Sequence, residues 1–260
     1  MRICEIFRSI QGEGRLTGTE SVFVRASGCN LRCRYCDTPY ASWMPEGADL
    51  SIEEILLRID ELAGSPPSEA VAAALDLLAN ELPMATEREK KADSKVRHVV
   101  ITGGEPMLFA ELIPLTAALK RQGRHVTIET AGTLYLPVEC DLMSISPKLS
   151  NSTPPPESDP RWTWRHEMHR NAPDVMRRLM AGYDYQLKFV VGCRADCTEV
   201  EEYLATLPDI DRSRAMLMPQ GTDPEDLAET ARWLEPYCLA HGLHYCPRRH
   251  IDWFGSLRGL

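Results

Sequence analysis

The sequence predicts an α/β protein folded as an incomplete (β/α)6-type barrel. Short apolar, β-branched runs alternate with helical patterns along the chain, which is typical of βα units that feed a parallel sheet. Six such runs can be counted, and six strands favour an incomplete barrel over a closed barrel of eight. Because 260 residues with 43% apolar content can bury a substantial core, we expect one domain over residues 1–260.

The expected strands are short runs in which β-branched residues are common. They are SVFVRA (21–26), HVVIT (98–102), HVTIET (125–130), LMSIS (142–146), YQLKFVV (185–191) and AMLMP (215–219). The first expected helix begins after Ser51, because S-I-E-E is a capping box and apolar residues follow it at helical spacing. Further helices are expected near 68–82, 109–122, 173–181, 198–206 and 223–241.

Two segments interrupt this alternation, and we interpret both as surface insertions. Residues 64–96 contain GSPPSEA, a helical stretch and the charged run EREKKADSK. Residues 150–164 contain NSTPPPESDPRWTW, in which Trp162 and Trp164 lie beside prolines. A lid over a site and a variable loop are equally good interpretations of this second segment.

The composition disfavours nucleic acid as the main partner. The formal net charge is -9, whereas phosphate binding needs a concentrated basic surface, and RRH at 248–250 is the one basic run worth naming. The opening MRICEIFRSIQGEG lacks the apolar core of a signal peptide, and no later segment is apolar enough to span a membrane. We therefore expect a cytoplasmic protein.

Three of the nine cysteines lie within eight residues, directly after the first expected strand. Cys29, Cys33 and Cys36 form a C-x3-C-x2-C pattern. Three thiolates can surround one iron–sulfur cluster, but they leave one iron without a protein ligand. That open iron suits a small molecule, and the methionine end of S-adenosylmethionine fits it. The spacing, with Tyr35 before the last cysteine, resembles that of the radical S-adenosylmethionine superfamily.

Two other uses of the cysteines are weighed against this hypothesis. The loop could bind zinc with a histidine or a distant cysteine as fourth ligand, but no C-x2-C or H-x3-H partner lies in the expected register. Cys193 and Cys197 could host a second cluster, although no further pair lies near them. The scattered cysteines are mostly expected to be small buried hydrophobes.

Polar residues follow the expected strands, at the edge where parallel α/β barrels carry their chemistry. The glycines of T-G-G-E-P permit close approach to a ligand, and Glu105 can hold an ammonium group. We expect these residues to converge on a largely apolar cavity. They are Arg25, Thr102 to Pro106, Glu129, Thr130, Ser146 to Lys148, Lys188, Pro219 and Gln220.

Several motifs taken together resemble those of the 7-carboxy-7-deazaguanine synthase family. The resemblance extends over nearly the whole chain, and Q-G-E-G and C-D-T are its most specific parts. It implies a lyase that converts 6-carboxy-5,6,7,8-tetrahydropterin to 7-carboxy-7-deazaguanine with loss of ammonia, on the route to queuosine. It also implies a 4Fe-4S cluster, S-adenosylmethionine and Mg2+. The motifs are EIFRSIQGEG (5–14), FVR (23–25), CDT (36–38), TGGEP (102–106), ETAGT (129–133), SPK (146–148) and LKFVV (187–191).

The resemblance also implies roles for individual residues. Cluster ligation falls to Cys29, Cys33 and Cys36, and Mg2+ binding to Thr38, since Mg2+ accepts few protein ligands when substrate and water complete its octahedron. The substrate-binding residues would be Ile10, Gln11, Gly12, Glu13, Arg25 and Thr102. Those for S-adenosylmethionine would be Gly104, Glu105, Ser146, Pro147, Lys148 and Gln220, with Glu105 at the methionine amine. No catalytic residue is assigned.

Some roles stay open at the level of sequence. The guanidinium of Arg25 suits the substrate carboxylate, because it can pair bidentately. Glu129 and Lys188 are either ligands or satisfied buried polar residues. Pro247 to His250 either close over substrate or form an exposed basic turn. The family further implies a homodimer and an electron donor such as flavodoxin or ferredoxin.

Two rival functions share parts of this pattern. An activase that generates a glycyl radical on a partner protein would use the same cysteine loop, but it would need a peptide groove and would have no use for Q-G-E-G or Thr38. An iron–sulfur electron-transfer protein would not produce 5'-deoxyadenosine. The segment 64–96 is longer than the compact pattern of the family has there, and 150–164 is an added loop, but both leave the motifs of the family intact.

Overall fold

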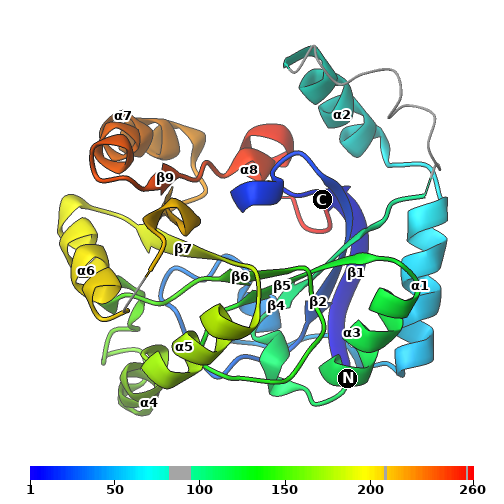
Figure 1. Cartoon of the computed structure of the whole chain (residues 1–260), viewed down its shortest axis with the longest axis horizontal. Helices are drawn as coiled ribbons and strands as arrows, with labels where there is room; N and C mark the ends of the chain where they lie inside the picture. Colours follow the sequence, from blue (N-terminus) through cyan, green and yellow to red (C-terminus); the bar gives the residue numbers. More distant parts are fainter. Residues whose placement is uncertain (82–94, 208–209, 256) are drawn as a thin grey trace.

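The computed structural model describes residues 1–81, 95–207, 210–255 and 257–260, and in these ranges nine strands form one sheet (Figure 1). The strand order is β3-β1-β2-β4-β5-β6-β7-β8-β9. Neighbours from β2 to β9 pair in parallel. The strands are β1 Arg2–Ile10, β2 Glu20–Ala26, β3 Ala48–Asp49, β4 His98–Gly103, β5 His125–Thr130, β6 Leu142–Ile145, β7 Tyr185–Val191, β8 Ala215–Pro219 and β9 His244–Tyr245.

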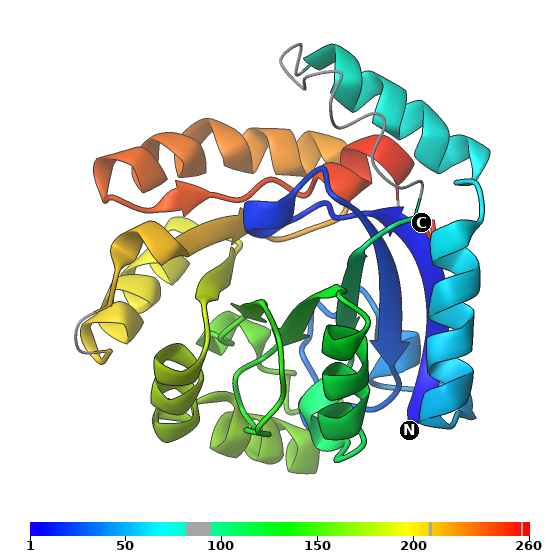
Figure 2. The same cartoon turned by 45° about the vertical axis from the view of Figure 1, so that its right-hand side comes forward.

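The six expected strands are confirmed as β2, β4, β5, β6, β7 and β8, which lie side by side in chain order. The sheet curves without closing, so the incomplete barrel is confirmed as well (Figure 2). The expected count of six strands was too low, because β1 and the two-residue strands β3 and β9 extend the sheet at its ends. β1 pairs antiparallel with β2, with a bulge between Ile3 and Glu5.

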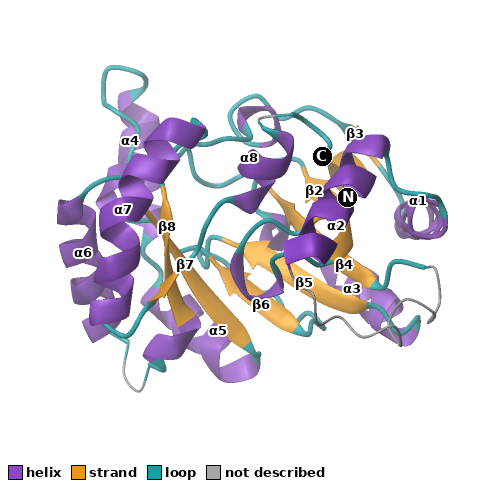
Figure 3. Ribbon diagram, turned by 90° about the horizontal axis from the view of Figure 1, so that it is seen from above, coloured by secondary structure: helices purple, strands orange, loops and turns teal. Residues whose placement is uncertain are grey.

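Eight α-helices lie in the described ranges, largely around the outside of the sheet (Figure 3). The capping box at Ser51 is confirmed: the Ser51 hydroxyl accepts the Glu54 N–H, and the Glu54 carboxylate accepts the Ser51 N–H at 2.7 Å. The helices are α1 Ile52–Gly64, α2 Glu69–Glu81, α3 Leu112–Arg121, α4 Pro160–Arg170, α5 Pro173–Gly182, α6 Arg194–Ala205, α7 Pro224–Ala240 and α8 Arg249–Phe254. None of these helices is long and apolar enough to cross a membrane.

The two insertions are only partly irregular. Within 64–96, the expected helical stretch is α2, while the charged run lies outside the described residues except for Lys95. Within 150–164, the interpretation as a loop is wrong from Pro160 onward, where α4 begins. Asp159 caps this helix and Pro160 occupies its first turn, so the proline marks a helix start.

Successive side chains of a strand point to opposite sides of the sheet. The alternation of apolar and polar residues therefore gives the sheet an apolar outer face and a polar inner face. On β7, Leu187 and Phe189 belong to the main apolar core that packs under the outer helices, whereas Gln186 and Lys188 point inward. The open barrel therefore has a polar interior. The inward residues of β5 to β7 include Thr127, Glu129, Ser144, Gln186 and Lys188.

The segment after β1 crosses the open barrel and reaches its far side (Figure 2). The Gly14 N–H donates to the Cys246 sulfur at 3.2 Å, and the Arg15 N–H donates to Gln186 Oε1 at 2.9 Å. The Arg249 N–H donates to the Gly12 carbonyl at 3.0 Å. Residues 11–16 thus connect the first strand to β7 and to the chain after β9.

Candidate active site

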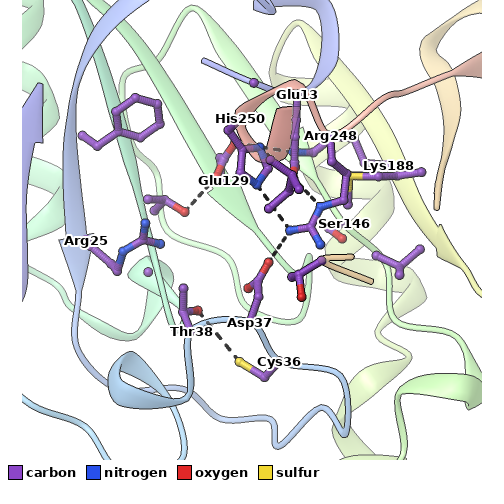
Figure 4. A pocket seen from close by; sticks show the side chains of 18 of the residues that line it. Glu13, Arg25, Cys36, Asp37, Thr38, Glu129, Ser146, Lys188, Arg248 and His250 are labelled. Atoms are coloured by element: carbon purple, nitrogen blue, oxygen red, sulfur yellow. Dashed lines mark hydrogen bonds and ion pairs between the residues drawn. The ribbon is translucent and has the colours of Figure 1, made fainter. Parts of the chain in front are cut away.

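A cavity of about 360 Å³ lies on the inner face of the sheet. The cysteine loop forms one side of it and the segment after β1 another, and Arg248 and His250 contribute further lining (Figure 4). Other C-terminal residues in 251–255 and 257–260 also line it. Apart from Glu105 and Pro147, all of the expected site residues line it. They are Ile10, Gln11, Gly12, Glu13, Arg25, Cys29, Cys33, Cys36, Thr38, Thr102, Gly104, Ser146, Lys148 and Gln220.

The three cysteines of the loop face the same cavity. The Cys36 N–H donates to the Cys33 carbonyl at 3.2 Å, which closes the turn between the last two. Burial raises the pKa of Cys29 to about 12 and that of Cys33 to about 11, so these thiols are protonated near neutral pH when no metal is bound. Thiolate ligation to iron would therefore release protons.

The donor set of the loop fits an iron–sulfur cluster better than a single ion. Among the described residues, no three His, Cys, Asp or Glu side chains come close enough together to hold one metal ion. A cluster is larger than an ion and accepts more widely separated thiolates, all of which open here onto one cavity. No such grouping surrounds Cys193 and Cys197 in the described chain either, and Cys193 is exposed at the start of α6.

The T-G-G-E-P segment is fastened to the start of the cysteine loop. The Gly104 N–H donates to the Ala26 carbonyl at 3.1 Å, and the Glu105 N–H donates to the Gly28 carbonyl at 2.8 Å. A Cβ on Gly103 would collide with the Ala26 backbone, and one on Gly104 with the Gly28 carbonyl. The two glycines are thus required by close approach to the chain itself, rather than only by approach to a ligand.

Glu105 is fully buried and lies behind the cavity wall. Its carboxylate accepts hydrogen bonds from the Met107 N–H at 3.0 Å, the Ala131 N–H at 2.8 Å and the Thr130 hydroxyl at 2.8 Å. Burial raises the pKa of this carboxyl group. These bonds join the loop after β4 to the end of β5, and the expected contact with an amine stays a prediction.

The side expected to hold S-adenosylmethionine follows β6 and β8. Lys148 Nζ donates to the Ser146 hydroxyl at 2.7 Å, and both side chains line the cavity. The Gln220 N–H donates to the Val191 carbonyl at 2.9 Å, which fixes the start of that loop. Pro147 lies between two lining residues without lining the cavity itself.

Lys188 is the centre of a buried charge network at the opposite side (Figure 4). Its Nζ lies 2.8 Å from Glu13 Oε2 and 3.4 Å from Glu129 Oε1. Glu129 also accepts hydrogen bonds from Gln11 Nε2 at 3.2 Å and from the Thr102 hydroxyl at 2.8 Å. The network joins β4, β5 and β7 to the Q-G-E-G segment, so Glu129 and Lys188 are bound polar residues that also line the cavity.

The charges of this network fix its protonation. Burial alone would raise the pKa of Glu13, but the charges of Lys188 and Arg248 lower it well below its ordinary value. Burial alone would lower the pKa of Lys188, but Glu129 and Glu13 raise it above its ordinary value. Glu13 is therefore an anion and Lys188 a cation at neutral pH.

The C-terminal RRH run folds into the site, so the interpretation as an exposed basic turn is wrong for Arg248, which is buried and lines the cavity. Arg248 Nε lies 3.3 Å from Glu13 Oε1, and a second nitrogen of the guanidinium pairs with Asp37. His250 Nδ1 lies 3.8 Å from the same Glu13 oxygen. A Cβ on Gly12 would lie 2.6 Å from the His250 backbone nitrogen. The first glycine of Q-G-E-G is therefore needed for the close approach of residues 248–250.

Arg25 and Thr38 approach the cavity from β2 and from the cysteine loop (Figure 4). Arg25 Nε donates to Glu5 Oε1 at 2.6 Å, while its two Nη groups donate to no described residue. Thr38 makes no side-chain cap to the turn that follows, and its hydroxyl lies 3.8 Å from the Cys36 sulfur. Both side chains therefore keep polar groups available to a ligand.

Sequence reasoning missed several lining residues. Phe7 and Ser9 line the cavity from β1, and the period of two was the signal that could have placed them on one face. Glu5 continues the same alternation without lining the cavity itself. Glu5 pairs with Arg25 and also accepts the Tyr40 hydroxyl at 3.1 Å. Arg258 packs over the Tyr40 ring at 3.9 Å, and no pattern in the sequence pointed to it.

Comparison with known proteins gives a consistent set of relatives. No protein-family model matches the chain. The 7-carboxy-7-deazaguanine synthase of Rhodopirellula baltica is 42% identical over 258 residues, which cover 99% of this chain and 88% of the relative. The enzyme of the same name from Halobacterium salinarum is 37% identical over 258 residues, which cover 96% of this chain and 88% of the relative.

Solved structures agree with these relatives. The crystal structure of QueE from Escherichia coli superposes with a TM-score of 0.59 and 26% identity, covering 96% of this chain and 94% of that one. The structure of SuiB from Streptococcus suis bound to S-adenosylmethionine superposes with a TM-score of 0.50 and 13% identity, covering 90% of this chain and 51% of that one. The second likeness shows a shared fold.

Proposed function

Because this chain belongs to the 7-carboxy-7-deazaguanine synthase family of radical S-adenosylmethionine lyases, we propose that its cavity converts 6-carboxy-5,6,7,8-tetrahydropterin to 7-carboxy-7-deazaguanine with loss of ammonia. The observation that carries the proposal is that three cysteines and the Lys188 network face one cavity from different sides. A radical initiator and a polar substrate would thus meet within a space of about 360 Å³.

The cofactors would occupy the side formed by the cysteine loop and the ends of β4, β6 and β8. When bound, a 4Fe-4S cluster and S-adenosylmethionine supply a radical that removes hydrogen from substrate. Cys29, Cys33 and Cys36 would hold the cluster. The residues for S-adenosylmethionine would be Gly104, Glu105, Ser146, Pro147, Lys148 and Gln220. Glu105, which joins the loop after β4 to the end of β5, would receive the methionine amine.

The substrate would bind between Arg25 and the Lys188 network. The unoccupied Nη groups of Arg25 suit the pterin carboxylate, since a guanidinium pairs with it in two parallel hydrogen bonds. Gln11, Thr102 and Lys188 orient the carboxylates of Glu129 and Glu13, and these can accept hydrogen bonds from ring N–H groups. The remaining contacts would come from Ile10 and Gly12.

For magnesium, the proposal assigns the Thr38 hydroxyl as a protein ligand, with substrate and water oxygens as the others. Its support is that this hydroxyl lines the cavity and caps no turn. We further propose a one-electron donor such as flavodoxin or ferredoxin, because reduction of the cluster needs an external electron. We likewise propose that the protein acts as a cytoplasmic homodimer, an expectation that rests on the family resemblance and the sequence.

The test is anaerobic incubation of the reconstituted protein with S-adenosylmethionine, a reductant, Mg2+ and carboxytetrahydropterin, followed by mass analysis. The expected products are 7-carboxy-7-deazaguanine, ammonia and 5'-deoxyadenosine. Formation of 5'-deoxyadenosine without the deazapurine would indicate another radical enzyme, such as an activase. Absence of both products from a protein with an intact cluster would indicate an electron-transfer protein.

A further inference from the structure

Helix α4, which lies in and beyond the insertion at 150–164, packs against the cysteine loop. The Trp162 ring stacks on the Arg32 guanidinium, whose central carbon lies 4.0 Å from the ring centroid. His166, one turn further along the helix, is fully buried and reaches the backbone of the same arginine. Neither residue takes part in the function proposed above.

His166 binds the loop through both ring nitrogens. The Arg32 backbone N–H donates to Nδ1 at 3.1 Å, and Nε2 lies 2.8 Å from the Ser152 hydroxyl. Because Nδ1 accepts, the ring proton must be on Nε2, which donates to Ser152. The Ser152 hydroxyl in turn donates to the Leu149 carbonyl at 2.6 Å. The imidazole is therefore neutral, in agreement with burial, which lowers the pKa of His166 to about 4.

The same segment binds the loop on the other side of Cys33. The Arg34 backbone N–H donates to the Ser152 carbonyl at 2.9 Å. Residues 32 and 34 flank Cys33, so both neighbours of the middle cysteine are bonded to residues 150–166. Since a peptide bonded at both neighbours has little freedom, the direction in which Cys33 points is fixed from outside the loop.

The Arg32 side chain extends this arrangement to the first cysteine. Its Nη1 donates to the carbonyls of Cys29 and Leu31, both at 2.8 Å, while Trp162 covers the guanidinium. Arg165 packs on the same ring at 4.7 Å. Stacking on an aromatic ring restricts the guanidinium to the plane from which it reaches both carbonyls.

We propose that α4 is a buttress that holds the cysteine loop in its cluster-binding conformation, with His166 as the principal positioning residue. The consequence is slower loss of the cluster, because Cys29 and Cys33 need not be reordered each time an iron–thiolate bond opens. The inference depends on the cluster of the proposed function and not on its substrate. Its test can therefore be carried out without turnover.

The central experiment compares two variants that each keep one of the two hydrogen bonds. His166→Asn places an amide oxygen near the position of Nδ1 and can still accept the Arg32 N–H. His166→Gln places its amide nitrogen near the position of Nε2, which retains the bond to Ser152 and removes the acceptor for Arg32. His166→Leu removes both.

The measurement is the rate at which the anaerobically reconstituted protein loses its cluster absorbance in the presence of a ferrous chelator, together with iron content and the midpoint potential. We expect loss rates about ten-fold above the parent for His166→Leu and His166→Gln, since an unpaired buried N–H is costly, and a rate near that of the parent for His166→Asn. Trp164→Ala is the matched control on the same helix, because that ring is 65% exposed. It should leave the rate unchanged.

Equal rates for the Asn and Gln variants would overturn the proposal, because a role only in folding would not distinguish them. If His166→Leu does not fold, the comparison of Asn with Gln decides alone. A parent protein that takes up no cluster would contradict the proposed function instead. A parent that makes product while all His166 variants keep their cluster would leave the function intact and remove the buttress.

Discussion

The two sides of the cavity are ordered by different physics. On the substrate side, Lys188, Glu13 and Arg248 form a buried network in which every charge faces an opposite one. On the cofactor side, backbone hydrogen bonds and the stacking of Arg32 on Trp162 order the loop, and Cys29 and Cys33 are neutral thiols. The substrate side carries its ionic network permanently, whereas the thiols of the cofactor side would become charged only with iron.

This difference predicts how each side fails. Removing one member of the ionic network leaves its partners charged and buried, which costs both stability and activity. Removing a thiol leaves a small apolar gap that the iron-free protein tolerates, while the cluster is lost.

Replacing a cluster cysteine should have the largest effect on activity. Cys33→Ala should abolish cluster uptake and product formation together, because two thiolates cannot retain the cluster. Its melting temperature without iron should stay close to that of the parent. Iron analysis, visible absorbance and product assay measure the three quantities. Cys193→Ser, which removes an exposed thiol outside the cavity and keeps a capping side chain at the start of α6, is the control and should change none of them.

A variant that kept its activity would refute ligation by three cysteines. A large loss of stability in the iron-free variant would instead show that the cofactor side depends on Cys33 for its fold.

Removing the central cation should damage both stability and turnover. Lys188→Met leaves Glu13 and Glu129 without their shared partner, so we expect the free energy of unfolding to fall by about 3 kcal/mol. Displaced carboxylates should lower kcat/KM by about a hundred-fold. Urea unfolding and steady-state kinetics measure these effects.

Lys120→Met is the matched control for this variant. Lys120 pairs with Asp141 at 2.6 Å, but both side chains are partly exposed and lie outside the cavity. We expect a cost of about 1 kcal/mol or less and unchanged kinetics. If Lys188→Met and Lys120→Met lost the same stability, burial would not explain why the Lys188 network matters more than an exposed ion pair.

The network should also appear in the pH dependence of stability. The pKa of Glu13 is lower in the folded protein than its ordinary value of about 4.3, so its contribution is present above that pH and declines as the pH falls below about 4. Cys29 and Cys33 add no pH dependence in this range, since their pKa values lie near 12 and 11.

Thermal unfolding of the iron-free parent and of Glu13→Gln tests this point. Both are followed from about pH 3, where carboxylates titrate, to about pH 8, where they are ionised. The parent should be the more stable protein near neutrality, and the difference should shrink as the solution becomes acidic. A difference that did not vary with pH would contradict the ionised state of Glu13.

The sequence predicted the central sheet because six runs rich in β-branched residues carry their own strand signal. It did not predict β1, since Arg2, Glu5 and Arg8 interrupt the apolar pattern of that segment, while Phe7 and Ser9 face a cavity that only the folded sheet creates. Similarly, α4 was hidden by its prolines, although Asp159 and Pro160 form a capped helix start. Local signals thus specified the strands, whereas tertiary contacts specified the elements around the site.

The site followed the same rule. Motifs and strand ends predicted that the cysteines, Arg25 and Thr102 lie at one site, and all of them line the same cavity. The bond between Glu13 and Lys188 joins residues 175 positions apart, and that between Glu13 and Arg248 joins residues 235 apart. Spacing in a single sequence carries no information on such pairs, so the network became visible only in the fold.

The smallest effect is expected when the same substitution, threonine to valine, is made on the substrate side and on the cofactor side of the cavity. Thr102→Val removes a hydroxyl that donates to Glu129 at 2.8 Å, so the free energy of unfolding should fall by about 1 kcal/mol. Thr38→Val removes a hydroxyl whose contact is a sulfur at 3.8 Å, and the iron-free protein should keep its stability. Instead, the Mg2+ concentration for half-maximal turnover should rise. Urea unfolding and magnesium titration of turnover distinguish the two, and a stability loss at Thr38 with an unchanged magnesium requirement would show that both sides of the cavity are organised in the same way.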